Sequence, residues 1–433
     1  MNLRKLYFNT VMRIYNDRLS FESLYPEILK DLDDRDKRRL INLVNQFFRH
    51  FSFIEKFLCE KIDKNIEDQD IKAEMLILCA GVEFFYLDSS TDYSIVNEYV
   101  ELSKEILGQG KFKYINAILR RMTELEMTEA DKSSKRALYS SHPDWITAKL
   151  TDQYGKETAE KIMRFNQTIP PVYIRSNRMK NGRDGLALIL AGEDVLAAGV
   201  EGFADFLRIE SGNAVGSKAF EEGRFYIQDP PHSIPALLLQ PVRNDKILDL
   251  CCAPGGKSSF VQEITGNKAK LWLNDISQKK RVVIKLNFKR LGLKFDKLTF
   301  QEAQKFQAFE DFDKILIDAP CTGSGNFRRH PESRWNKTEE MIAELTKLQL
   351  AILKRSAAYV RKGGYIVYST CSIFKEENMD IVNAFLEFDP DFVIDPVNDP
   401  NLEPFRNPDG SYSVIPGVHG HEGAFAVRLK RVR

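Results

Sequence analysis

The 433-residue sequence lacks the features of membrane, secreted and disulfide-stabilised proteins. No apolar run approaches the roughly 20 residues that cross a bilayer. The first nine residues contain no sustained apolar segment of the kind found in a secretory signal. Six cysteines in so long a chain do not indicate a disulfide framework. We therefore predict a cytoplasmic protein without a membrane partner.

The sequence also lacks an excess of charge of either sign, with a formal net charge of +1. Its 43% hydrophobic and 29% charged content is typical of a globular protein, and its length suggests two or three domains. Two local basic clusters are present: Lys279, Lys280, Arg281, Lys285, Lys289 and Arg290, and Arg328, Arg329, His330 and Arg334. We interpret the first cluster as a solvated helix face. The second cluster directly follows Cys321, a candidate catalytic residue. Cationic side chains that bind a phosphate group (a phosphate clamp) would be useful there.

Proline is scarce at the start of the chain, where Pro26 is the only one before Pro143. Apolar residues there recur at helical spacing, which predicts an all-α domain over residues 1–137. The charged segment at 128–136 is predicted to be a linker or its edge.

Prolines become frequent after this point, and short apolar runs at 172–175 and 225–227 have the character of strands. They predict a small α+β subdomain over residues 141–240. From 241 to 433, strands alternate with helices, which predicts a doubly wound, Rossmann-like α/β sheet of about seven strands. The expected strands are 247–251, 271–274, one ending near 299–303, 315–318, 365–368, 391–395 and 424–429, and the expected helices lie near 257–265, 277–291 and 338–361.

Two cysteines close two of the expected strands. Asp318 and Cys321 follow the aliphatic run at 315–317, and Cys371 follows the run at 365–368. If the two strands are neighbours, they lie about 4.8 Å apart. Both sulfurs can then reach one substrate atom at the carboxyl edge of the sheet, where ligands bind. This arrangement predicts paired sulfur chemistry at a cofactor site.

The other cysteines have a simpler interpretation. A buried cysteine is usually a small apolar residue, which fits Cys59 and Cys79 on helices and Cys251 and Cys252 at a strand end. A zinc site that joins the last two to the catalytic pair is an alternative. The absence of any C-x-x-C pair weighs against it, and no metal is predicted.

A glycine pair, Gly255 and Gly256, follows the first strand of the sheet. Such a turn lets the backbone approach a ligand and exposes the N–H groups of the next helix. Asp275 closes the second strand about 20 positions later, the separation seen for a ribose-binding acid. A helix N-cap is the alternative role for Asp275. Glu302, after the third strand, contacts either an adenine amino group or solvent.

Three ordered motifs resemble those of one family. They are Cys252-Ala253-Pro254-Gly255-Gly256-Lys257, then Asp318-Ala319-Pro320-Cys321 with Arg328-Arg329-His330-Pro331 and Trp335, then Tyr368-Ser369-Thr370-Cys371-Ser372 with Glu376, Glu377 and Asn378. Together they resemble the RNA cytosine-5 methyltransferases of the NOL1/NOP2/Sun type. The chain is most similar to the bacterial Sun (Fmu) branch, which acts on 16S ribosomal RNA. Residues 114–121 resemble its NusB-like RNA-binding domain, and residues 223–229 resemble the segment before its catalytic domain.

This resemblance implies methylation of cytosine C5 in RNA with S-adenosylmethionine as cofactor. Cys371 is implied as the nucleophile that attacks C6, and Cys321 as the group that releases the product. Asp318 and Lys257 are implied to hold the polar edge of the base and to stabilise charge during attack. A transfer RNA cytosine-5 methyltransferase is an alternative, and a non-catalytic RNA-binding ribosome-assembly protein is another.

The resemblance also implies the ligands of the cofactor and the RNA. The cofactor-binding residues are Cys251, Cys252, Ala253, Pro254, Gly255, Gly256, Lys257, Asp275, Glu302 and Asp318, and the RNA-binding residues are Arg328, Arg329, His330 and Arg334. Three places depart from the family pattern: the Cys251-Cys252 pair in place of Cys-Ala, Glu302 in place of the commoner Asp, and residues 419–425 of the closing strand, where the family often has Asp-Gly-Phe-Phe. The expected partner is 16S ribosomal RNA or a small-subunit assembly intermediate, bound by a monomer.

Overall fold

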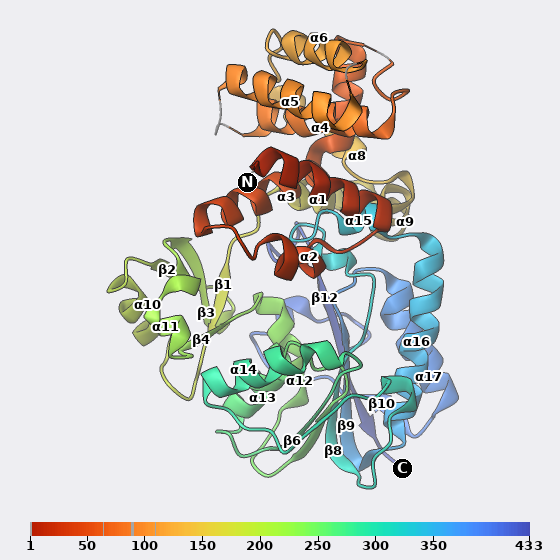
Figure 1. Ribbon diagram of the computed structural model, residues 1–433. Coiled ribbons are helices and arrows are strands. Elements are labelled where there is room, and N and C mark those ends of the chain that lie inside the picture. The colour runs from red at the N-terminus through yellow and green to blue at the C-terminus, as the bar shows by residue number, and fades with distance from the viewer. Residues whose placement is uncertain (1, 64, 88–90, 109) are drawn as a thin grey trace. The chain divides into compact units, whose positions relative to one another are not determined.

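Figure 1 shows the fold in a computed structural model, which describes residues 2–63, 65–87, 91–108 and 110–433. The chain forms two compact units. The first contains Met1–Thr168 and Phe327–Lys337, and the second contains Ile169–Asn326 and Thr338–Arg433. No sequence pattern predicted that residues 327–337 belong with the N-terminal helices. The predicted division at 137–141 and 240–241 remains a prediction.

The described part of the first unit is helical, as predicted. Its helices are α1 (Leu3–Asp17), α2 (Phe21–Ile28), α3 (Asp34–Lys61), α4 (Ile71–Tyr86), α5 (Asp92–Leu107), α6 (Phe112–Met122), α7 (Glu129–Lys132), α8 (Lys135–Ser140), α9 (Asp144–Gln167) and α15 (Ser333–Asn336). The helically spaced Val44, Phe47 and Ile54 of α3 are buried in its core. Segment 128–136, predicted to be a linker or its edge, forms α7 and the start of α8. Thr128 begins α7 through reciprocal hydrogen bonds with Asp131.

A small antiparallel sheet begins the second unit and confirms the predicted α+β subdomain. Its strands are β1 (Tyr173–Ser176), β2 (Leu196–Val200), β3 (Phe203–Ser211) and β4 (Phe225–Ile227), in the order β2-β3-β1-β4. Helices α10 (Arg183–Ala191) and α11 (Lys218–Glu221) pack their apolar residues against it.

The larger sheet confirms the predicted Rossmann-like fold. Its strands are β5 (Lys246–Asp249), β6 (Lys270–Asn274), β7 (Lys297–Thr299), β8 (Phe312–Asp318), β9 (Val360–Thr370), β10 (Phe392–Ile394), β11 (Tyr412–Val414) and β12 (Ala424–Arg431), and its helices are α12 (Ile234–Leu239), α13 (Gly256–Ile264), α14 (Arg281–Leu291), α16 (Glu339–Ala357) and α17 (Met379–Phe388). The order along the sheet is β10-β12-β9-β8-β5-β6-β7, with β11 paired to β12. Strands β5 to β9 pair in parallel, whereas β10, β11 and β12 pair antiparallel.

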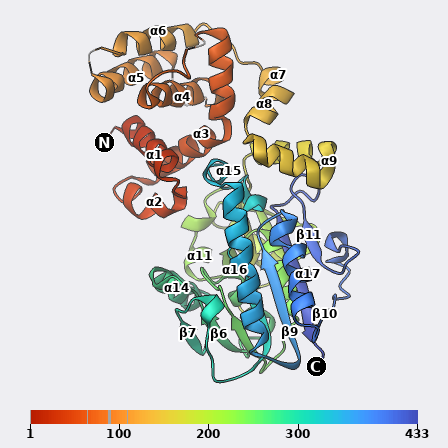
Figure 2. The same cartoon turned by 90° about the vertical axis from the view of Figure 1, so that its right-hand side faces the viewer.

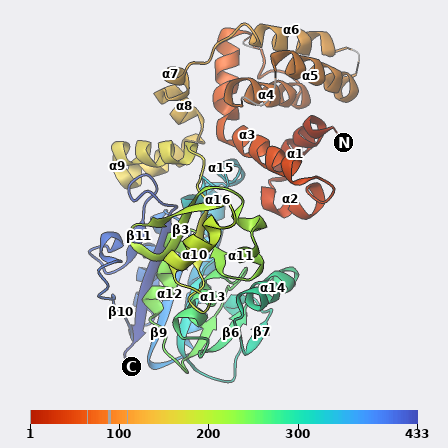
Figure 3. The same cartoon turned by 90° about the vertical axis from the view of Figure 1, so that its left-hand side faces the viewer.

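Helices cover both faces of this sheet. Figure 2 shows α16 and α17 over one face, and Figure 3 shows α12 and α13 over the other. Successive residues of a strand enter opposite cores, as Ile247 and Leu248 do on β5. Because both faces are covered, the central residues of the parallel strands form short continuous apolar runs, which made the strands recognisable in the sequence.

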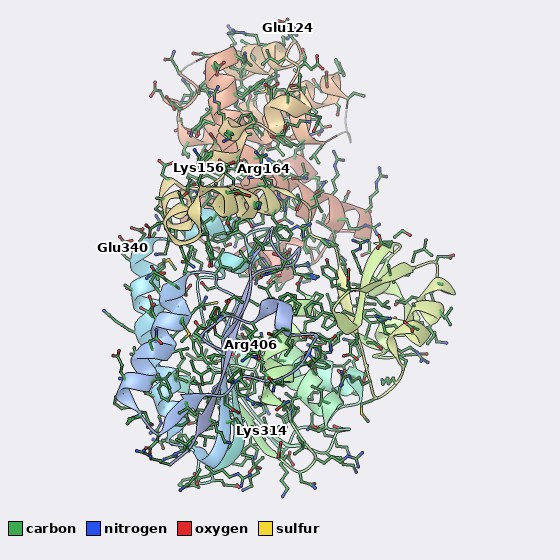
Figure 4. All side chains as sticks on the ribbon, turned by 180° about the vertical axis from the view of Figure 1, so that it is seen from behind. Glu124, Lys156, Arg164, Lys314, Glu340 and Arg406 are labelled. Atoms are coloured by element: carbon green, nitrogen blue, oxygen red, sulfur yellow. The ribbon has the colours of Figure 1, made fainter. Side chains whose placement is uncertain are left out.

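The order in which the chain adds strands to the sheet reverses at β5. Strands β6 and β7 lie on one side of it, and β8 and β9 lie on the other. In open α/β sheets, ligands bind beyond the carboxyl ends of the strands at such a switch point. Helix α16 returns antiparallel to β8: Lys314, near the start of the strand, lies at the opposite end of the second unit from Glu340, near the start of the helix (Figure 4).

Candidate active site

The glycine turn connects β5 to α13 and lies at the switch point of the sheet. Gly255 adopts a φ of 104°, a conformation that favours glycine. A Cβ atom on Gly256 would lie only 2.8 Å from Cε1 of Tyr226, so the backbone there must pass close to the ring. Both glycines are therefore required by the path of the turn that exposes the start of α13.

Acidic side chains lie after the neighbouring strands. The Asp275 carboxylate is buried and accepts N–H bonds from Ala253 (3.1 Å) and Ser277 (2.9 Å). Each oxygen keeps a lone pair for a further donor. Ser277, and not Asp275, is the N-cap of the following 3₁₀ turn at Gln278–Lys280, and the ribose role of Asp275 stays a prediction. Glu302 contacts Gln304 (2.8 Å) and Lys305 (2.9 Å), and its adenine contact also stays a prediction.

Burial raises the pKa of three groups beside the turn. Burial raises the pKa of Asp249 to about 7, against the hydrogen bond that the Ser258 hydroxyl donates to it. Burial also raises the pKa of the Cys251 and Cys252 thiols. Protonated, buried thiols are unreactive, which supports the interpretation of this pair as packing residues. In the described ranges, no three His, Cys, Asp or Glu side chains are grouped to hold a metal ion.

An ion pair joins the two strands that flank the switch point. Lys257 Nζ lies 2.5 Å from Asp318 Oδ2, so a residue after β5 contacts the last residue of β8. Burial lowers the pKa of Lys257, but attraction by Asp318 and the hydrogen bond that Lys257 donates to it, with a further contribution from Cys371, raise the pKa above its usual value overall. Lys257 is therefore an ammonium ion at neutral pH.

The two cysteines predicted to meet at neighbouring strands do so. Strands β8 and β9 are parallel neighbours with Asp318 opposite Ser369, and the Sγ atoms of Cys321 and Cys371 lie 3.1 Å apart. The hydrogen bond with Cys371 raises the pKa of Cys321 well above that of a free thiol, as do burial and the charges of Glu377 and Asp318. Cys321 is therefore the thiol that keeps its proton.

Sequence reasoning missed several residues that support this pair. Ser324 and Ser372 hydroxyls lie 2.9 Å apart, and the Gly325 N–H donates to the Cys371 carbonyl at 2.9 Å. Gln349 on α16 reaches the same loops. Ser372 belongs to the motif that contains Cys371, so it could have been recognised. Nothing in the sequence linked Gln349, in the middle of a helix, to this site.

One residue of the predicted RNA-binding cluster at 328–334 does not fit that role. Arg334 is fully buried in the first unit, where it donates to the carbonyl oxygens of Ser141 (2.8 Å) and Asn166 (3.2 Å). Burial lowers its pKa well below the usual value. Its predicted RNA contact is wrong, because these carbonyl groups already bind the guanidinium that a phosphate would need.

The rest of segment 327–337 also packs within the first unit. Trp335 donates its indole N–H to the Phe48 carbonyl at 2.9 Å. The Arg328 guanidinium lies 4.3 Å from the centre of the Phe165 ring and is 9% exposed. Arg329 and His330 are half-buried, and their RNA contact remains a prediction.

Known families match successive parts of the chain. The family described as 16S rRNA methyltransferase RsmB/F matches residues 236–430. The NusB family matches residues 1–124, and a ferredoxin-like domain of RsmF/B-like methyltransferases matches residues 142–216. A ribosomal RNA small subunit methyltransferase B of Shewanella oneidensis is 30% identical over 434 residues, which is 99% of each chain. The chain belongs to the ribosomal RNA small subunit methyltransferase B family.

A further relative and two solved structures are also similar to this chain. The ribosomal RNA small subunit methyltransferase B of Citrobacter koseri is 30% identical over 437 residues, covering 99% of this chain and 98% of its own. The crystal structure of PH0851 covers 99% of both chains with a TM-score of 0.80 and 24% identity. The structure of NSun6 from Pyrococcus horikoshii with SFG covers 67% of this chain and 98% of its own, with a TM-score of 0.61 and 22% identity. The family resemblance, the rRNA methyltransferase class and the NusB-like N-terminal domain are thereby confirmed.

Proposed function

We propose that the protein transfers a methyl group from S-adenosylmethionine to C5 of a cytosine in 16S ribosomal RNA, through a covalent bond between Cys371 and C6. The observation that carries this proposal is the 3.1 Å contact between the two Sγ atoms at the switch point. Family membership favours ribosomal over transfer RNA and an enzyme over an assembly factor. We further propose that the enzyme works in the cytoplasm as a monomer, on 16S ribosomal RNA or an assembly intermediate. No helix in the described residues is long and apolar enough to cross a membrane.

Attack begins from the sulfur of Cys371, which interacts electrostatically with the Lys257 ammonium. The sulfur electron pair forms the bond to C6, and the π electrons of the C5–C6 bond move to C5. Lys257 and Asp318 contact each other beside this sulfur, where they can hold the polar edge of the base and offset the charge that develops. The cytosine must leave any base stack to enter the site.

Release needs a base for the remaining proton on C5 of the methylated ring. Cys321, as thiolate, takes this proton, the C–H electron pair restores the C5–C6 double bond, and the S–C6 pair returns to Cys371. Cys321 must first lose its own proton to water. That loss becomes easier once Cys371 is bonded to C6, because the contact with Cys371 is the largest cause of the raised pKa of Cys321.

The residues at the switch point fit the cofactor. S-adenosylmethionine, when bound, supplies an electrophilic methyl group. Asp275 would hold the ribose hydroxyls with its two free lone pairs, and the turn at Gly255 and Gly256 would bring backbone close to the cofactor. Glu302 follows the next strand and would take the adenine amino group.

The test is methylation with purified protein and labelled S-adenosylmethionine, on protein-free 16S ribosomal RNA, small-subunit particles and transfer RNA in parallel. We expect label in 16S ribosomal RNA, recovered as 5-methylcytosine, and none with Cys371→Ala. Label in transfer RNA alone would support the alternative enzyme. No label, together with no binding of S-adenosylmethionine by the folded protein, would support the assembly factor.

A basic surface on α14 offers a second RNA contact, for which the sequence interpretation was a solvated helix face. Five cations are exposed over residues 279–289, and none has an acidic partner among the residues that the structure describes: Lys279, Lys280, Arg281, Lys285 and Lys289. The helix lies beside the cofactor turn, because Asn287 donates to the Pro254 carbonyl at 3.0 Å. Arg290 does not belong to this surface, since it binds backbone carbonyls of Phe220 and Phe225.

We expect Lys280→Ala/Lys285→Ala to weaken RNA binding and to lower its salt dependence. Each lysine that contacts a phosphate contributes about 1 to the slope of log affinity against log salt. Binding isotherms at several salt concentrations measure this slope. Lys270→Ala/Lys362→Ala is the matched control, because both lysines are exposed at the opposite, amino ends of their strands. Equal slopes for the two double variants would show that the α14 surface is only solvated.

A further inference from the structure

A buried carboxylate lies behind the two thiols and contacts the loop that carries Cys321. Glu377 is fully buried. Its Oε1 accepts the Thr322 backbone N–H at 2.8 Å, and its Oε2 accepts the Thr322 hydroxyl at 2.5 Å. Gln349 Nε2 donates both to Glu377 Oε1 (3.1 Å) and to the Pro320 carbonyl (2.9 Å). The residues on both sides of Cys321 are thus fixed by one pair of side chains.

We propose that Glu377 and Gln349 are positioning residues that fix Cys321 against Cys371 and reserve it for release rather than attack. This inference rests on the proposed covalent mechanism and adds two residues that do not touch the substrate. Their effect reaches the reaction through Thr322 and Pro320, the chain neighbours of Cys321.

The donors around Glu377 require a carboxylate. Three hydrogens point at its two oxygens, from the Thr322 N–H, the Thr322 hydroxyl and the Gln349 amide. A carboxylate is acceptor-only, whereas a glutamine would turn its own NH₂ group toward one of these donors. No described cation pairs with Glu377. Its negative charge is therefore held by hydrogen bonds alone and stays close to Cys321.

The same network extends to the Cys371 loop. The Tyr368 hydroxyl donates to the Glu377 carbonyl at 2.7 Å, and Ser324 Oγ accepts the Ile373 N–H at 2.9 Å. Both loops are thus tied together behind the sulfurs, which explains how two thiols from different strands stay in contact.

Charge distinguishes the two thiols. Lys257 acts on Cys371, whereas Glu377 acts on Cys321 and contributes to its raised pKa. A negative charge next to a thiol disfavours the thiolate. Cys371 therefore supplies the nucleophile, and Cys321 ionises only after the adduct has formed.

The first test measures thiol alkylation against pH in the full-length protein, without RNA or cofactor, with each cysteine quantified by peptide mass spectrometry. Glu377→Gln removes the charge, so we expect the alkylation profile of Cys321 to move about 1 pH unit lower. Gln349→Leu keeps the charge and should leave the profile in place. Glu387→Gln, an exposed change of the same kind on α17, is the control. A Glu377→Gln profile that coincides with the wild type overturns the charge effect.

The second test adds RNA and S-adenosylmethionine and measures SDS-resistant adducts. Gln349→Leu, which loosens the Cys321 loop and keeps the charge of Glu377, should accumulate the Cys371 adduct and lower kcat at unchanged KM, with Cys321→Ala as the benchmark. An adduct in the benchmark but not in Gln349→Leu overturns the positioning role. No adduct in the benchmark overturns the covalent mechanism instead, and the alkylation profiles still decide the charge effect.

A milder pair of variants applies if Glu377→Gln does not fold. Thr322→Val removes one hydrogen bond to Glu377 and keeps the charge, whereas Thr322→Ser keeps both. We expect adduct accumulation with valine and wild-type turnover with serine. Equal turnover of the two variants overturns the positioning role.

Discussion

Replacing Cys321 with alanine is expected to trap the enzyme on its RNA. Attack by Cys371 needs only its own thiolate and the neighbouring Lys257, both of which remain. Release loses its base, because the Cys321 sulfur in contact with Cys371 is gone. Loss of a general base typically slows a reaction about 10²–10⁴-fold. An SDS-resistant protein–RNA adduct should therefore accumulate, and it can be isolated from cells and its RNA sequenced to identify the cytosine.

The Cys321→Ala/Cys371→Ala double variant should abolish the adduct. Cys59→Ala is the control, because this half-buried thiol lies on α3 in the other unit. A folded Cys321→Ala protein that binds S-adenosylmethionine but forms no adduct would contradict the assignment of roles. An adduct through Cys321 in Cys371→Ala would show that the roles are exchanged.

The meeting of the two cysteines could be predicted because it depends on backbone rules. Parallel strands covered on both faces contain continuous apolar runs, and such runs in β8 and β9 were visible in the sequence. Parallel neighbours carry their carboxyl ends on one edge, which placed Asp318, Cys321 and Cys371 together. The same rule placed the glycine turn after β5 at this edge of the sheet.

The second layer of the site could not be predicted, because it depends on side-chain pairing. Gln349 contacts Glu377 across 28 positions of sequence, and no periodicity records such a partner. The prediction that Arg334 contacts RNA was wrong for a related reason. Basic residues after Cys321 suggested a phosphate clamp, but the Arg334 guanidinium binds backbone carbonyls inside the helical unit. A residue type alone does not reveal which of its donors are already used.

Replacing Arg175 with methionine should cause a large loss of stability in the second unit. Arg175 on β1 is fully buried and donates to Glu263 (2.8 Å) and Ser259 (3.0 Å) on α13, and to the Gly256 carbonyl (2.9 Å) at the cofactor turn. Removing one partner of a buried ion pair costs about 3–5 kcal/mol, because the other charge stays buried. Urea denaturation should show this loss, and S-adenosylmethionine should bind more weakly because the turn loses a contact.

The defect should depend on pH in a defined direction. Burial already raises the pKa of Glu263 against the opposing effect of Arg175, and loss of the guanidinium raises it further. A carboxyl group whose folded pKa lies above its unfolded value destabilises the fold as pH rises from the unfolded pKa through the folded one. The loss in Arg175→Met should therefore be smaller near about pH 5 than near about pH 8.

Two further variants separate the buried charge from the side chain itself. Arg175→Met/Glu263→Leu removes both charges, and replacing both partners of a buried pair by apolar residues is often close to neutral, so most of the stability should return without the pH dependence. Arg178→Met breaks the partly exposed pair with Asp205 (2.6 Å) and should cost at most about 1 kcal/mol. If the single and double Arg175 variants were equally unstable at both pH values, the lost packing of Arg175 on Phe260, 4.5 Å from its ring centre, would be the cause, and not the charge left on Glu263.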